Sequence, residues 1–243
     1  MGRRELPLRQ STRMILSHKH RFIFLKTMKT ASSSIEIALS TQCGPEDIIT
    51  PTREDLGEQR AIPEQNYRLD HPLVPRRSLW RRLWRRPERH YHPTVGYYEH
   101  MPAWRIKAYV GDDIWRRYYK FAFVRNPWDR QLSFYFYKTR NEHPRRSFDA
   151  FMRSKRRALV ESRGIYTVDG MIAVDFLGRY EDLEAHFKRA LIDIGLDPTL
   201  ALPKANTSDK PKHRPYREAY NERTRQLVAD WYEHEIAEQG YEF

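Results

Sequence analysis

The most constraining feature of this sequence is the stretch FIFLKTMKTASSSIEIAL, residues 22–39. Its first four residues are all apolar, which predicts a central parallel strand over Phe22–Leu25. Apolar residues at helical spacing come later and predict a helix over Ser32–Leu39. A strand, a tight loop and a helix start in this order present unpaired backbone N–H groups and the positive end of a helix dipole to one point. The stretch therefore predicts an anion-binding loop.

The side chains of this loop suit an anion. Lys29 adds a full positive charge at the turn, and Ser32, Ser33 and Ser34 can donate hydrogen bonds while allowing close backbone approach. The loop is not a Walker A motif, because GxxxxGK[ST] is absent and no glycine occurs in it. A basic, serine-capped helix start also follows many strands that bind nothing, so the loop alone leaves both interpretations open.

The rest of the chain alternates between strands and helices. Predicted strands are Met14–Leu16, Phe121–Val124 and Ile172–Leu177; predicted helices are two short ones within 101–119, one beginning near Asn126, one over 180–195 and one over Tyr216–Ile236. This alternation predicts an α/β fold with a central, mostly parallel sheet and helices on both faces. The length of 243 residues suits a single domain over 1–243, in which the proline-rich residues 44–75 form a surface excursion.

A second stretch places a cation at the end of another strand. Arg125 directly follows the predicted strand, and Ser133 lies two turns into a helix that starts with Asn126, Pro127 and Asp129 as cap, first-turn residue and dipole partner. At the carboxyl end of a strand in an open α/β sheet, the arginine would face the same crevice as the first loop. Arginine can bind a phosphate bidentately, so a ligand with two separated anionic groups is predicted. An ion pair at the helix start and an ordinary helix serine are the alternatives.

Together, KTMKTASSSIEIAL and FVRNPWDRQLSFY resemble the carbohydrate sulfotransferase superfamily, in its bacterial sulfotransferase family 2-like form. The resemblance extends through GYYEHMPAWRIKAYVG, FLGRYEDLEAHF and LPKANTSDKPKHRPYREAYNERTRQLV, and fades between about Gly44 and Pro93. It implies a P-loop-like three-layer fold and transfer of a sulfuryl group from 3′-phosphoadenosine 5′-phosphosulfate (PAPS) to a carbohydrate hydroxyl. The product nucleotide would be adenosine 3′,5′-bisphosphate (PAP), and no metal is implied.

The resemblance also implies roles for individual residues. Lys29 matches the loop lysine that contacts the bridging oxygen of the leaving phosphate, and Arg125 and Ser133 match the residues that hold the 3′ phosphate. The 5′ side would be lined by Lys26, Thr30, Ala31, Ser32, Ser33 and Ser34, and a loop over the nucleotide would contribute Lys212, Arg214 and Tyr216. Many family members carry glycines where this chain has Ala31 and Ser32; small side chains there preserve close approach.

Transfer to an alcohol requires a general base. The family often places a histidine shortly before the helix that precedes the arginine strand, and His100 occupies that position. His90, His92 and Glu99 are nearby substitutes. Arg179 and Glu181, in the segment GRYEDL, are predicted to form a structural ion pair at a strand-to-helix turn.

A basic insert at about 44–93 would border the acceptor cleft. Its segment PRRSLWRRLWRRPERH carries seven arginines between Arg76 and Arg89 and predicts an amphipathic helix. Such a helix could dock on the core, clamp an anionic polysaccharide, or lie on acidic lipids as a peripheral membrane contact. The expected acceptor is a glycan, glycolipid or glycoside, and the arginines of this segment would suit an anionic one.

The net charge of +12 implies anionic partners. It also leaves two other functions open, a nucleic-acid-binding protein and a nucleotide kinase with a degenerate P-loop. No nucleic-acid-binding signature appears, so nucleic acid is not an expected partner. A catalytically silent interaction protein is a further alternative. Without a signal-like or membrane-spanning apolar run, the chain is expected to be cytoplasmic, with the arginine-rich segment as a candidate peripheral membrane contact.

Overall fold

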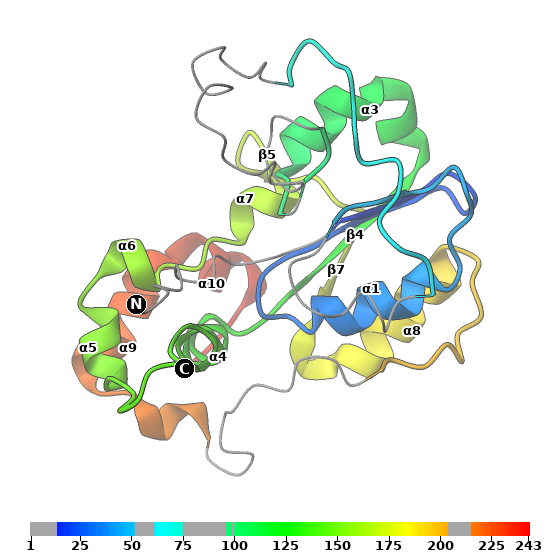
Figure 1. The fold of residues 1–243 in the computed structure, drawn as a ribbon. Helices are drawn as coiled ribbons and strands as arrows, with labels where there is room; N and C mark the ends of the chain where they lie inside the picture. Colours follow the sequence, from blue (N-terminus) through cyan, green and yellow to red (C-terminus); the bar gives the residue numbers. More distant parts are fainter. Residues whose placement is uncertain (1–13, 52–60, 75–95, 99, 204–214) are drawn as a thin grey trace, which may run out of the picture.

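The computed structural model describes residues 14–51, 61–74, 96–98, 100–203 and 215–243, which form a central sheet between two layers of helices (Figure 1). The five-stranded sheet has the order β3-β1-β2-β4-β7. Its strands are β1 (Ile15–Ser17), β2 (Phe22–Leu25), β3 (Ile48–Ile49), β4 (Tyr119–Val124) and β7 (Phe176–Arg179). Strands β2, β4 and β7 pair in parallel, whereas β1 is antiparallel to both β2 and β3. The prediction of a mostly parallel central sheet is confirmed.

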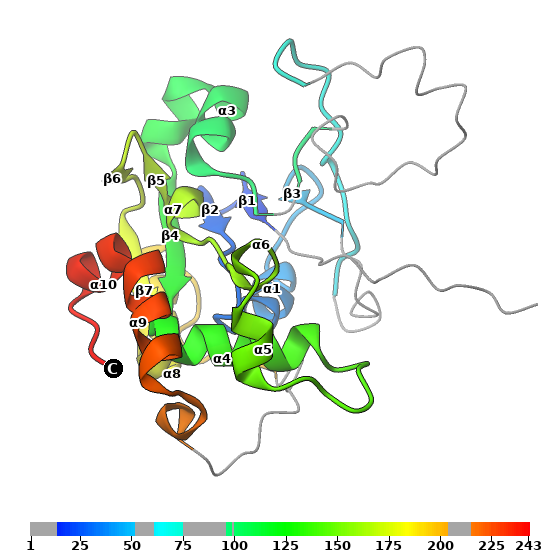
Figure 2. The same cartoon turned by 90° about the vertical axis from the view of Figure 1, so that its left-hand side faces the viewer.

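The apolar runs that predicted the central strands cover both faces of the sheet. On one face Phe22, Phe24, Phe121 and Phe123 pack against α1 (Ser32–Ser40) and α8 (Leu183–Asp193). On the other face the alternate residues of β2 and β4 pack against the remaining helices (Figure 2). These helices are α3 (Ala103–Arg117), α4 (Pro127–Lys138), α5 (Phe148–Met152), α6 (Lys155–Ala158), α7 (Arg163–Tyr166), α9 (Glu222–Trp231) and α10 (Glu233–Gln239).

The register of the parallel strands decides where their following residues lie. Leu25 at the end of β2 pairs with Ala122, and Val124 at the end of β4 pairs with Arg179 of β7. The carboxyl ends of β2, β4 and β7 therefore meet at one edge of the sheet. The residues that follow each strand are brought together there, as the sequence predicted for the first loop and Arg125.

Helix α4 is fixed at this edge by capping and by a buried ion pair. The Asn126 side chain accepts a hydrogen bond from the backbone N–H of Trp128, and Pro127 is the first helical residue, as predicted. The guanidinium of Arg130 donates to both carboxylate oxygens of Glu235 in α10, at 2.5 and 2.7 Å, with both side chains almost fully buried. The ion pair with α10 thus holds α4 in position at this edge of the sheet.

Three predicted elements differ from the observed ones. The strand predicted over Ile172–Leu177 is two strands: β6 (Met171–Ile172) forms a hairpin with β5 (Thr167–Val168), and β7 belongs to the main sheet. Left-handed backbone at Asp169 and Gly170 makes the hairpin turn. The helix predicted over Tyr216–Ile236 is a 3-10 turn, η3 (Tyr216–Ala219), followed by α9 and α10.

These differences have local causes. Asn221 caps α9 with its side chain and so starts a new helix, and Tyr232 leaves helical geometry with φ −124° between α9 and α10. The predicted surface excursion over 44–75 is wrong at Ile48–Ile49, because this pair adds a buried edge strand to the sheet. The helical segment within 101–119 is broken at Gly111 (φ 79°), which confirms two short helices.

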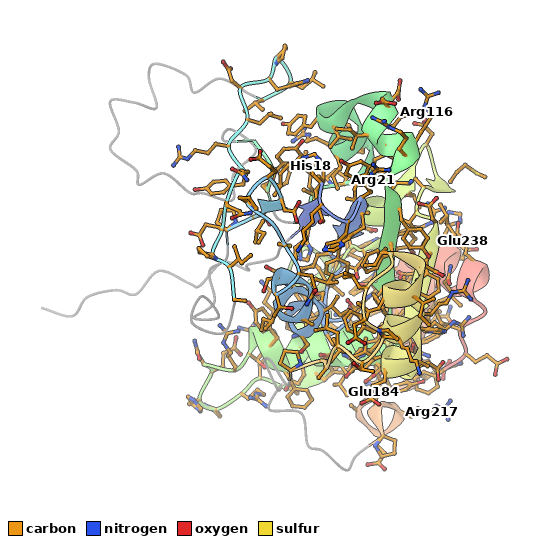
Figure 3. All side chains as sticks on the ribbon, turned by 90° about the vertical axis from the view of Figure 1, so that its right-hand side faces the viewer. His18, Arg21, Arg116, Glu184, Arg217 and Glu238 are labelled. Atoms are coloured by element: carbon orange, nitrogen blue, oxygen red, sulfur yellow. The ribbon has the colours of Figure 1, made fainter. Side chains whose placement is uncertain are left out.

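The outer faces of these layers carry charge. Arg116, Glu184 and Arg217 are exposed and lie at the periphery of the molecule in Figure 3. None of the helices in the described ranges combines the length and the apolar character needed to cross a bilayer. The arginine-rich segment 76–89 lies outside the described residues.

Candidate active site

The two sequence stretches that predicted anion binding are in direct contact. The loop after β2 spans residues 26–31, and Arg125 follows β4 at the same edge of the sheet. Arg125 donates a hydrogen bond from Nη1 to the backbone carbonyl of Lys29, at 2.9 Å. Residues 96 positions apart thus form one site.

The backbone of the loop has the geometry of an anion-binding nest. Lys29 and Ala31 have positive φ angles of 61° and 56°, whereas Thr30 between them and Ser32 after them do not. Alternation of right- and left-handed residues turns successive N–H groups toward one concave point. No residue type marked Lys29 as left-handed, because lysine has no preference for that region. Ala31 was signalled by the glycine that many family members carry there.

The first turn of α1 continues this nest. Ala31 is the N-cap residue and supplies no side-chain cap, and the first backbone hydrogen bonds to its carbonyl come from Ser34 and Ile35. The N–H groups before Ser34 have no partner within the helix. They can bind an anion with the help of the helix dipole.

Hydroxyl groups fix the loop from within. Thr27 is fully buried, donates to the carbonyl of Phe123 in β4, and lies 3.0 Å from the Thr30 hydroxyl. The Ser32 hydroxyl donates to the carbonyl of Thr27 at 2.9 Å. The hydroxyls of Thr30 and Ser32 therefore hold the loop together, which leaves their backbone N–H groups as the ligand-facing donors. Thr27, which is the second residue after β2, was not singled out from the sequence.

The two lysines of the loop have different surroundings. The ammonium of Lys26 lies 3.3 Å from a carboxylate oxygen of Glu36 and 3.2 Å from the Ser33 hydroxyl, and the side chains of Lys26 and Glu36 are 3% and 0% exposed. The ammonium of Lys29 is half-buried and lies 4.5 Å from the centre of the Tyr137 ring in α4. Lys26 is thus tied to α1, whereas Lys29 reaches across the site to α4.

Arg125 is oriented by its neighbours. Its Nε and Nη2 atoms donate to one carboxylate oxygen of Asp129, at 2.9 and 2.6 Å, and its guanidinium lies 3.9 Å from the centre of the Tyr180 ring. The ion pair at the helix start, an alternative in the sequence analysis, therefore exists alongside the contact with the loop. Ser133 lies four residues beyond Asp129 on α4 and is buried, so the two share a helix face.

His100 is attached to the loop by its ring. Nδ1 lies 2.7 Å from the backbone carbonyl of Lys26. A carbonyl only accepts, so Nδ1 carries the proton and Nε2 presents a lone pair. Nε2 is buried and has no hydrogen-bond partner among the described residues. Burial, followed by the nearby charge of Lys26, lowers the pKa of His100 to about 3, so the ring is neutral and Nε2 carries no proton at neutral pH.

Some predicted contacts are wrong or lie elsewhere. Arg179 and Glu181 do not pair with each other: Arg179 donates to the carbonyl of Gln239, and Glu181 accepts from the backbone N–H of Asn126 at 2.6 Å. Tyr216 packs its ring against Phe243, at 5.9 Å between ring centres. Outside the described residues are His90, His92, Glu99, Lys212 and Arg214, and their predicted roles stay predictions.

The site brings together groups that suit an anion and an imidazole nitrogen that carries no proton. An N–H nest and Lys29 occupy the end of β2, a fixed guanidinium occupies the end of β4, and an unpaired imidazole nitrogen is held on the loop itself. The described residues hold no group of three or more histidine, cysteine or acidic side chains placed to bind a metal ion.

Comparison with known proteins identifies the family. An uncharacterized protein of Archaeoglobus fulgidus is 32% identical over 125 residues, which cover 47% of this chain and 98% of that protein. No solved structure matches the chain. The model of the sulfotransferase family matches residues 12–242. The match takes in the nest loop, Arg125, Ser133 and His100, and the chain belongs to the sulfotransferase family.

Proposed function

We propose that the protein transfers a sulfuryl group from PAPS to a hydroxyl of a carbohydrate acceptor. The observation that carries this proposal is the hydrogen bond from His100 to the Lys26 carbonyl. It makes the proton acceptor part of the anion-binding loop, so that a group bound by the loop lies beside a base.

The donor is proposed from the two cationic positions. The nest and Lys29 would take the 5′ phosphosulfate, with Lys26, Thr30, Ala31, Ser32, Ser33 and Ser34 forming that side. Arg125 and Ser133 would take the 3′ phosphate. The assignment of the 5′ side is supported by the alternation of right- and left-handed residues in the loop. The assignment of the 3′ side is supported by the face of α4 that Asp129 and Ser133 share. A nucleotide with phosphates at both ends matches two cationic positions better than a single anion does.

The proposed reaction is an in-line displacement at sulfur. The acceptor oxygen forms a bond to sulfur while the bond from sulfur to the 5′ phosphate oxygen breaks. Nε2 of His100 takes the proton of the hydroxyl, and Lys29 stabilises the negative charge that develops on the leaving phosphate. Most of the rate enhancement comes from alignment and electrostatic stabilisation, because no covalent intermediate with the protein is formed. The acceptor class, a glycan, glycolipid or glycoside, is proposed from the family resemblance.

Three variants separate donor binding from chemistry. Lys29→Ala and Arg125→Ala should each weaken PAP binding in calorimetry, because each removes a cation from a phosphate. His100→Gln should leave PAP affinity within about twofold and lower the transfer of labelled sulfate from PAPS to a glycoside panel by about 100-fold to 10,000-fold, the usual contribution of a general base.

The matched control is His18→Gln. His18 also bonds through Nδ1, to the Tyr118 hydroxyl at 2.7 Å, but it lies in the turn between β1 and β2, at the opposite end of β2 from the loop. This variant should keep both PAP binding and turnover. Unchanged turnover in His100→Gln would place the base at another residue.

A further inference from the structure

A cation outside the predicted donor residues lies beside Lys29. Tyr137, near the end of α4, has two cations against its ring: the ammonium of Lys29 at 4.5 Å from the ring centre and the guanidinium of Arg140 at 4.4 Å. Arg140 directly follows the last residues of the helix and is half-buried. The two cationic centres are therefore no more than about 9 Å apart.

Arg140 lacks an acidic partner. In the described part of the chain, the Tyr137 ring is the contact of its guanidinium, and no carboxylate pairs with it. By contrast, Arg125, Arg130 and Arg146 in the same region each pair with an aspartate or glutamate. An arginine that is half-buried, held against a ring and left without a carboxylate keeps its N–H donors available to an anion from outside the protein.

The position of Arg140 along α4 indicates which anion. Asp129, Ser133 and Tyr137 follow one another at intervals of four residues, so they share one face of the helix and are spaced by about 6 Å along its axis. At one end of this face Arg125 is hydrogen-bonded to Asp129. At the other end the ammonium of Lys29 lies against the Tyr137 ring. Arg140 lies beyond the Lys29 end, away from the position proposed for the 3′ phosphate.

We propose that Arg140 binds the sulfuryl oxygens of the donor. The inference rests on the proposed function, in which Lys29 contacts the leaving phosphate oxygen. The sulfuryl group is attached to that oxygen, so its own oxygens lie next to Lys29 on the side away from the nucleotide. A guanidinium offers several donors in a fixed plane, which suits a group with three oxygens that share negative charge.

The test compares two nucleotides that differ only in the sulfuryl group. Affinities for PAPS and PAP are measured by calorimetry without an acceptor, for the wild type and for Arg140→Gln. The expected result is that Arg140→Gln weakens PAPS binding about tenfold and changes PAP binding less than twofold, with Arg140→Lys in between. Lys138→Gln removes an exposed positive charge from the same helix end and should change neither affinity.

Two results would overturn the proposal. An unchanged ratio of PAPS to PAP affinity in Arg140→Gln would show that the residue does not contact the sulfuryl group. An equal loss for both nucleotides would place it on a phosphate instead. If the wild type bound neither nucleotide, the proposed function itself would fail, so the two failures are distinguishable.

Discussion

At the scale of single residues, His100 is the side chain whose surroundings most restrict its chemistry. Its Nδ1 proton is committed to the Lys26 carbonyl, and its buried Nε2 has no partner among the described residues. Burial disfavours the charged form and, together with the Lys26 charge, lowers the pKa to about 3. A ring that stays neutral presents an unprotonated Nε2, and its lowered pKa makes the stability of the protein depend on pH.

The pH dependence of stability should reveal this histidine. Its pKa is about 6.5 in the unfolded chain and about 3 in the folded protein. Between these values the unfolded chain binds a proton that the folded protein does not. The free energy of unfolding should therefore fall as pH drops from about 6.5 toward 3, by up to about 1.4 kcal/mol per pH unit from this residue.

The comparison with His100→Gln isolates this contribution. Urea unfolding at a series of pH values gives, for the wild type and for the variant, the slope of the free energy of unfolding against pH. The contributions of the other titrating groups cancel in the difference between the two slopes. The variant should lose less stability on acidification. Parallel curves for the two proteins would mean that the ring is protonated as easily in the folded state as in the unfolded state.

Some site residues could be predicted from sequence and others could not. Lys29, Arg125, Ser133 and His100 stand in motifs whose residue types suggest their chemistry. Thr27, Glu36, Asp129 and Tyr137 hold the loop, Lys26, Arg125 and Lys29 in place, and their partners lie between 4 and 108 positions away. The spacing of four residues between Arg125 and Asp129 is a local pattern, and the sequence offered that ion pair as an alternative; the other pairs join distant residues and are revealed by the folded structure.

At the scale of elements, the central prediction concerns the loop between β2 and α1. Its left-handed residues, Lys29 and Ala31, are not glycines, so the nest is strained. A left-handed conformation costs a residue with a Cβ atom roughly 1–2 kcal/mol. The loop keeps this geometry because buried hydroxyl bonds through Thr27 determine it from behind.

Ala31→Gly should relieve part of this strain. The variant is expected to be more stable than the wild type by up to about 1 kcal/mol, less the entropy that glycine adds to the unfolded chain, and to retain PAP binding. Ser33→Gly is the matched control, because Ser33 lies in α1 without a positive φ. It should lose roughly 0.5–1 kcal/mol. Urea unfolding measures both, and a destabilised Ala31→Gly would argue against the strained loop.

The strands were predictable from the sequence where burial requires a regular pattern of apolar residues. Strands β2 and β4 are apolar on both faces and are found close to their predicted ranges. The final helix was not, because Asn221 has a capping role that only its bonds to Thr224 reveal. Strand β3 has two residues, too few for a periodic signal, and it is defined by its pairing with β1.

At the scale of the whole molecule, parallel strands bring distant charges to one edge. The loop after β2 and the arginine after β4 would lie at opposite edges if these strands were antiparallel, and the observed pairing puts them in contact. The net charge of +12 favours anionic ligands in general, but it does not select among them. The choice of PAPS depends on whether both cationic positions are filled by one nucleotide.

The most direct test is a thermal-shift comparison of PAP, AMP and ATP. A ligand at 100 times its dissociation constant stabilises the folded state by about 2.7 kcal/mol, which raises the melting temperature of a chain of this size on the order of 5–10 °C. PAP should give such a rise and AMP, which lacks the 3′ phosphate, a much smaller one. Arg125→Ala should reduce the shift with PAP to that with AMP and leave the AMP shift unchanged. Equal shifts for PAP and AMP in the wild type, or a larger one with ATP and magnesium, would contradict a site built for PAPS.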